Sequence, residues 1–201
     1  VISVRDLGPE TTKKLLSFSQ TIRKNPEKFS QSLKGKAVLQ FLIESSTRTR
    51  TSFESATRAL GATSIGFSSG TSSLSKGESL LDTVQTLNQY GVQAIVIRHA
   101  YSGSAKQISE WTNASVINAG DGSHEHPTQA LLDALTLADE WNTDFSKKLP
   151  FEGKTVAIVG DISNSRVARS NLHLLSSLGA RVILCGPGSM IPSDMSLFPR
   201  H

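Results

Sequence analysis

The chain has 201 residues, and its 21 Lys and Arg exceed its 17 Asp and Glu to give a formal net charge of +4. The basic residues form no block, which argues against a nucleic-acid-binding arm and equally suits a small anionic substrate. No apolar run approaches the roughly 20 residues of a membrane-spanning helix, and Cys185 as the only cysteine excludes a disulfide framework. We therefore expect a cytoplasmic protein of one large or two small domains, with neither membrane nor nucleic acid as a partner.

Short apolar runs alternate with helical patterns along the chain, which indicates an α/β fold with a parallel β-sheet flanked by helices on both faces. In the first part of the chain, strands are predicted at 37–43, 63–67, 94–97 and 116–118. Helices are predicted there at 46–60, 78–90, 107–111 and 127–141. Pro127 favours the start of the last helix, because the first helical position needs no partner for a backbone N–H group.

The polar stretch 142–152, which contains Pro150 and has no periodicity, is the best candidate for a linker. The pattern then resumes with predicted strands at 155–159 and 181–185 and a helix at 166–178. We interpret 1–141 as one α/β domain and 153–201 as the start of a second, similar domain. Two βα units form too little sheet for a complete domain, so we expect the second one to be truncated in this chain.

Polar and charged residues gather directly after the predicted strands. Ligands of open parallel sheets bind beyond the carboxyl ends of the strands, so this distribution predicts a substrate site at that edge. The segments concerned are 46–50, 68–77, 98–99, 121–126 and 161–166. The arrangement indicates an enzyme with a polar substrate.

The segment 46–50 enters a helix, whose first backbone N–H groups form a natural anion site. Hydroxyl groups of Ser46, Thr47 and Thr49 would add donors, and Arg48 would add a planar fork that matches phosphate oxygens. The alternative is an ordinary capped helix with solvated arginines. Lys76, in a serine-rich loop, could close over an anion or be an ordinary exposed lysine.

Several other polar residues follow strands or open helices. Arg98 ends a buried strand and could contact a ligand or form an ion pair. His126 precedes Pro127, so the helix that starts there breaks the strand geometry a His-x-His metal pair would need, and we expect no metal. Instead, His126 and Gln129 offer an imidazole and an amide to a polarised carbonyl group. Arg166 opens a helix and suggests a second anion pocket.

Five sequence blocks carry a family resemblance, and they occur in the family's order. They are STRTRTSFE at 46–54, SSLSKGES at 72–79, VIRH at 96–99, NAGDG at 118–122 with HPTQALLD at 126–133, and GDIxxSRVARS at 160–170. With these blocks the chain resembles catalytic chains of aspartate carbamoyltransferases, in the aspartate/ornithine carbamoyltransferase superfamily. The residues at 76 and 128, a lysine and a threonine, match the aspartate type rather than the ornithine type. The resemblance extends from residue 1 to about residue 186.

The resemblance implies transfer of the carbamoyl group of carbamoyl phosphate to the α-amine of L-aspartate, giving N-carbamoyl-L-aspartate and phosphate in pyrimidine (UMP) biosynthesis. No cofactor is implied. The implied assembly is a homotrimer with shared active sites, with regulatory or other pyrimidine-pathway subunits as conceivable partners. Family members continue beyond this chain with further aspartate-binding loops, so we expect the chain as given to be poorly active.

The resemblance also assigns roles to individual residues. Ser46, Thr47, Arg48 and Thr49 would hold the phosphate group. The carbonyl oxygen would face Thr49, Arg98 and His126, and the carbamoyl amino group would face Gln129. Ser72 and Lys76 would come from the neighbouring subunit, and aspartate would meet Lys76 and Arg166. The residues implied in catalysis are Arg48, Thr49, Lys76, Arg98 and His126.

Two other interpretations stay open. A related transcarbamoylase, of the ornithine type or with another amine acceptor, would share these carbamoyl phosphate residues. An inactive homologue could instead serve as an assembly subunit, although the intact polar residues argue against that.

Overall fold

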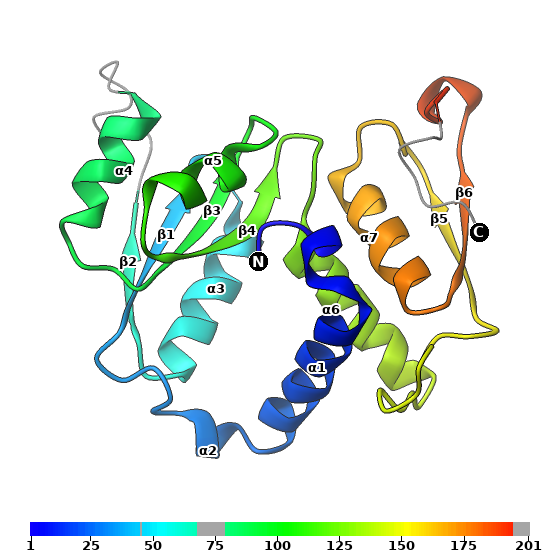
Figure 1. The fold of residues 1–201 in the computed structure, drawn as a ribbon, viewed down its shortest axis with the longest axis horizontal. Coiled ribbons are helices and arrows are strands. Elements are labelled where there is room, and N and C mark those ends of the chain that lie inside the picture. The colour runs from blue at the N-terminus through cyan, green and yellow to red at the C-terminus, as the bar shows by residue number, and fades with distance from the viewer. Residues whose placement is uncertain (45, 68–78, 195–201) are drawn as a thin grey trace. The chain divides into compact units, whose positions relative to one another are not determined.

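A computed structural model describes residues 1–44, 46–67 and 79–194 (Figure 1). The chain divides into two compact units. The first unit contains Val1–Ile2 and Ile22–Gly122, and the second contains Ser3–Thr21 and Ser123–His201. No helix among the described residues is long and apolar enough to cross a membrane.

The first unit is built on a four-stranded parallel sheet with the strand order β2-β1-β3-β4. Its strands are β1 (Ala37–Leu42), β2 (Thr63–Gly66), β3 (Ala94–His99) and β4 (Ser115–Asp121). The central strands β1 and β3 are nearly continuous apolar runs, as expected for parallel strands buried on both faces. The helices of this unit are α2 (Pro26–Phe29), α3 (Thr47–Ala59), α4 (Leu80–Asn88) and α5 (Ser104–Trp111).

Helices cover both faces of this sheet (Figure 1). Successive side chains of a strand point to opposite sides, so both faces can pack against helices. On one face Phe41 and Ile97 pack in a core with Ile108 of α5 and with α4. On the other face Leu42 packs in a core that includes Phe53 of α3. The predicted parallel sheet with helices on both faces is confirmed.

The second unit combines helices with a two-stranded parallel sheet. Its core joins Leu16, Ala134, Phe151 and Leu174, and each of these is almost completely buried. The elements are α1 (Val4–Lys24, whose last residues belong to the first unit), α6 (Pro127–Glu140), α7 (Arg166–Ser177), β5 (Thr155–Val159), β6 (Arg181–Cys185) and the short 3-10 helix η3 (Gly188–Met190). Strand β5, helix α7 and strand β6 form a βαβ unit.

Every strand and helix predicted from the sequence is present, with ends that differ by a few residues. Helices α1 and α2 were not predicted. The compact units also group residues differently from the predicted domains, because α6 shares its core with α7 rather than with the four-stranded sheet. The boundaries 1–141, 142–152 and 153–201 stay a prediction about the domains of the family.

Two glycines that end helices test how tightly the first unit is packed. Gly61 follows α3 and Gly91 follows α4, both with positive φ, where an alanine costs about 1 kcal/mol or more. A Cβ atom at Gly61 would lie 2.7 Å from the carbonyl oxygen of Ser30, whereas a Cβ atom at Gly91 would meet nothing within 4 Å. In urea unfolding followed by circular dichroism, Gly61→Ala should therefore lower the free energy of unfolding clearly more than Gly91→Ala. Equal losses of unfolding free energy would show that the Ser30 carbonyl group can move away from the new Cβ atom without cost.

Candidate functional site

In the first unit, the predicted anion-binding segment forms the N-terminus of α3. Ser46 is the N-cap, and its Oγ accepts a hydrogen bond from the Thr49 backbone N at 3.3 Å and donates one to Thr49 Oγ1 at 2.9 Å. Thr47 and Arg48 are exposed on the first turn. The segment therefore presents hydroxyl groups, first-turn N–H groups and a guanidinium group to solvent, which is the chemistry of an anion site.

Arg98 lies beside this helix start because of the pairing of the central strands. Leu42, at the end of β1, pairs with Arg98 in β3, and the backbone N atoms of Ile43 and Glu44 donate to the Arg98 carbonyl oxygen. These two hydrogen bonds hold the chain that leaves β1 against the backbone of Arg98, just before α3 begins. The side chain of Arg98 is 14% exposed, and its Nη1 lies 3.5 Å from Thr49 Oγ1.

Glu44 was not recognised from the sequence as part of this site. Its Oε1 accepts a hydrogen bond from Arg98 Nη2 at 2.7 Å, a charge-assisted pair. A carboxylate two residues after a buried strand and close to arginines was the available signal. Arg50 is turned away toward β2, with Nη2 donating to the Phe67 carbonyl oxygen at 3.4 Å.

His99 follows Arg98, and its contacts indicate a structural role. It is buried, and its Nδ1 accepts a hydrogen bond from the Tyr101 backbone N at 3.0 Å. Burial lowers the pKa of His99 below the ordinary value of histidine, against the opposing pull of Asp121 and Glu44. The imidazole therefore stays neutral near pH 7 and keeps Nδ1 as an acceptor for the loop after β3.

In the second unit, His126 and Gln129 lie at the start of α6. His126 is the N-cap residue, is buried, and donates its backbone N–H to Ser170 Oγ at 2.9 Å. Gln129 donates from Nε2 to Asp133 Oδ1 at 2.8 Å, one turn further along α6. Helix α7, which carries Ser170, therefore holds the backbone of the first residue of this pair.

Glu125 is a fully buried carboxylate that connects this network to the beginning of α1. Its Oε2 accepts hydrogen bonds from the Val4 backbone N at 2.8 Å and from Ser170 Oγ at 3.1 Å, and its Oε1 accepts one from Ser3 Oγ. These donors satisfy a charge that would be costly to bury alone. Glu125 thus has a structural role, because its hydrogen bonds hold the segment directly before α6 in place.

The remaining predicted residues are placed as follows. Arg166 is the first residue of α7 and is partly buried, directly after Ser165, whose Oγ accepts the N-cap hydrogen bond from the Ala168 backbone N at 3.1 Å. Ser72 and Lys76 lie outside the described residues. Among the residues that the structure describes, no group of three or more His, Cys, Asp or Glu side chains could hold a metal ion.

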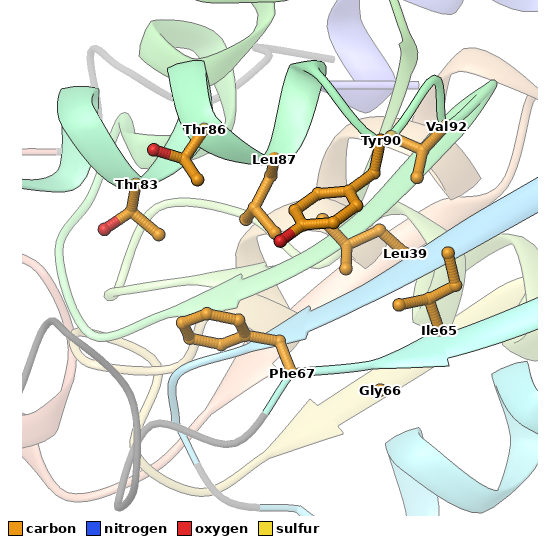
Figure 2. A pocket seen from close by; sticks show the side chains of 9 residues that line it. All are labelled: Leu39, Ile65, Gly66, Phe67, Thr83, Thr86, Leu87, Tyr90 and Val92. Atoms are coloured by element: carbon orange, nitrogen blue, oxygen red, sulfur yellow. The ribbon is translucent and has the colours of Figure 1, made fainter.

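The first unit also contains an apolar pocket of about 310 Å³ (Figure 2). Figure 2 shows Leu39, Phe67, Leu87 and Tyr90 among its lining side chains. The pocket includes none of the predicted site residues and offers only threonine and tyrosine hydroxyl groups as polar partners. It is therefore a poor match for a charged substrate, in contrast to the start of α3.

Comparisons with known proteins show which family the chain is similar to. Residues 1–139 match the family model of the aspartate/ornithine carbamoyltransferase carbamoyl-P binding domain. The aspartate carbamoyltransferase catalytic subunit of Solibacter usitatus is 44% identical over 199 residues, which are 98% of this chain and 64% of that relative. The chain thus spans less than two thirds of the length of this relative.

Solved structures of aspartate transcarbamoylases are also similar to this chain. The aspartate transcarbamoylase of Trypanosoma cruzi, in complex with carbamoyl phosphate and aspartate, is similar with a TM-score of 0.87 and 28% identity, over 98% of this chain and 64% of that chain. The catalytic subunit of M. jannaschii aspartate transcarbamoylase is similar with a TM-score of 0.85 and 34% identity, over 97% of this chain and 63% of that chain.

Two buried serines of α7 test the anchor behind His126. Ser170→Ala leaves the buried His126 N–H without its acceptor and should lower the free energy of unfolding by about 1–3 kcal/mol. Ser176→Ala is the matched control, because Ser176 Oγ is buried without a hydrogen-bond partner among the described residues and should be dispensable. Urea unfolding of the two variants measures the difference. Equal effects would mean that the Ser170 hydrogen bonds contribute nothing specific.

Proposed function

The chain belongs to the aspartate/ornithine carbamoyltransferase family, and we propose that it serves the transfer of a carbamoyl group from carbamoyl phosphate to the α-amine of L-aspartate. The products are N-carbamoyl-L-aspartate and phosphate. The observation that carries this proposal is the guanidinium group of Arg98 beside Thr49 at the N-terminus of α3. The aspartate acceptor is supported by the names of the relatives and by Lys76 and Thr128.

The N-terminus of α3 is the proposed phosphate site. Ser46, Thr47 and Thr49 supply hydroxyl donors, and the first-turn N–H groups and helix dipole favour a dianion. Arg48 is exposed on this turn, where its two terminal nitrogens can form a bidentate contact with phosphate oxygens. These groups would bind the phosphate both as part of the substrate and as the leaving group.

Thr49 and Arg98 are proposed to face the carbonyl oxygen, together with His126. The amine nitrogen of aspartate attacks the carbonyl carbon, the new N–C bond forms, and charge builds on the carbonyl oxygen. The C–O bond to phosphate then breaks, phosphate leaves with the electron pair, and the proton that the amine loses passes to the departing phosphate. Each donor aimed at the developing oxyanion contributes roughly 10²–10³ in rate.

Further roles complete the proposal. Gln129 accepts a hydrogen bond from the carbamoyl amino group, and Arg166 with Lys76 binds aspartate carboxylates. We propose a cytoplasmic homotrimer in which Ser72 and Lys76 reach the site of a neighbouring copy. Regulatory or other pyrimidine-pathway subunits are proposed as partners of that assembly.

Arg48 tests the phosphate assignment. Arg48→Ala removes a charged donor and should weaken carbamoyl phosphate binding at least about tenfold, since hydrogen bonds to charged groups contribute about 1.5–3 kcal/mol. Arg58→Ala is the matched control, because Arg58 is an exposed arginine in the last turn of the same helix. It should change the affinity by less than about twofold. Calorimetric titration with carbamoyl phosphate measures both, and an Arg48→Ala variant that binds as well as the parent refutes the assignment.

The shared site is tested by mixing two variants that should each lose carbamoyl phosphate binding, Lys76→Ala and Arg98→Ala. If a site takes Lys76 from one copy and Arg98 from another, a mixed oligomer contains some intact sites. Calorimetry should then detect carbamoyl phosphate binding in the mixture and in neither variant alone. A demonstrated mixed oligomer without any binding would place both residues of each site in one copy.

A further inference from the structure

We propose that Asp133 is a positioning residue that orients the side-chain amide of Gln129, so that the amide oxygen rather than the nitrogen faces the carbamoyl amino group. The inference rests on the proposed function, in which Gln129 contacts that group. It adds a residue that would let the site distinguish a carbamoyl from an acyl phosphate.

The carboxylate of Asp133 bridges two amides. Gln129 and Asp133 are four residues apart on α6 and therefore neighbours on one helix face, with Gln129 Nε2 donating to Asp133 Oδ1 at 2.8 Å. The other carboxylate oxygen, Oδ2, accepts a hydrogen bond from Asn171 Nδ2 of α7 at 2.7 Å. Both oxygens are thus engaged, and α7 holds the carboxylate in place.

An ionised carboxylate only accepts hydrogen bonds, so each amide that contacts it must present its NH₂ group. For Gln129, this fixes Nε2 on Asp133 and turns Oε1 the other way. Among the residues that the structure describes, Gln129 Oε1 accepts no hydrogen bond. The carbamoyl amino group is a donor, so the end of the Gln129 amide that Asp133 leaves unengaged is the end that it needs.

Asn171 shows how strongly the carboxylate imposes this polarity. Its Oδ1 is buried and has no hydrogen-bond partner among the described residues, which is unfavourable for a carbonyl oxygen. Turning the Asn171 amide over would instead place that oxygen against Asp133 Oδ2. The observed orientation therefore follows from the acceptor-only chemistry of Asp133, and the same constraint applies to Gln129.

Discrimination between carbamoyl phosphate and acetyl phosphate tests the proposal, because acetyl phosphate carries a methyl group in place of the amino group. The parent chain should bind carbamoyl phosphate more tightly by calorimetry. In Asp133→Asn the new amide can pair with either end of Gln129, so the ratio of the two affinities should fall by about fivefold, as for one lost hydrogen bond. Asp139→Asn is the matched control, since Asp139 is also an aspartate of α6 and accepts a hydrogen bond from an amide, Gln20 Nε2 of α1, at 3.5 Å. This variant should keep the parent ratio.

A double variant separates hydrogen-bond polarity from a general structural effect. In Asp133→Asn combined with Asn171→Asp, the carboxylate at 171 demands the NH₂ group of the asparagine at 133. The oxygen of that asparagine then faces Gln129 Nε2, which restores the original orientation. The affinity ratio should return to the parent value, and a double variant that keeps the reduced ratio of the single variant overturns the proposal.

A measurement on the unmutated chain covers the case in which Asp133→Asn does not fold. Carbamoyl phosphate should shift the side-chain carbonyl carbon resonance of Gln129, and acetyl phosphate should not. A shift of the Nε2 resonances alone contradicts the inference. Failure of the parent chain to bind carbamoyl phosphate at all refutes the proposed function and this inference together, whereas binding with an unchanged ratio in a folded Asp133→Asn refutes only the inference.

Discussion

The candidate site of the first unit depends on the pairing of β1 with β3. Because Leu42 lies opposite Arg98, the chain that leaves β1 donates two backbone hydrogen bonds to the Arg98 carbonyl oxygen before it enters α3. A shift of one residue in this pairing would turn the Arg98 side chain to the other face of the sheet. Since both strands are buried in the apolar core, the hydrophobic residues that stabilise the fold also bring Arg98 to Thr49.

In the second unit, the buried side chain of Glu125 helps to position the start of α6. The carboxylate of Glu125 is fully buried, and its hydrogen-bond donors come from Ser3, from Val4 at the first position of α1, and from Ser170 of α7. The same hydroxyl group of Ser170 that donates to Glu125 accepts the backbone N–H of His126. Residues far apart in the sequence therefore fix the start of α6, and helix α7 contacts it again through Asn171 and Asp133.

The sequence was sufficient to predict elements with clear periodicity, and it failed where polar residues are buried. Helix α1 was missed because Thr12 and Lys13 lie on its buried face and interrupt the apolar pattern. Lys13 is accommodated by a local ion pair with Glu10 at 2.7 Å and by the carbonyl oxygens of Lys147 and Lys148, and no local pattern reveals these two distant partners. In the same way, the residue types at Ser46 and Arg98 were enough to predict a site from the sequence. Their neighbours Glu44 and Asp133 could be assigned to the site only from the contacts in the structure.

The contacts of Arg98 explain why an arginine suits this position better than a lysine. One guanidinium nitrogen pairs with Glu44, the other lies 3.5 Å from both Thr49 Oγ1 and the Ala119 carbonyl oxygen, and Nε is buried without a partner among the described residues. A single ammonium group could not span these partners at once. The pair with Glu44 holds the guanidinium plane in place, and its longer and weaker contacts are the ones that face Thr49. In the proposed function, an incoming carbonyl oxygen would compete with those weak contacts, while the strong ion pair stays intact and keeps the donor positioned.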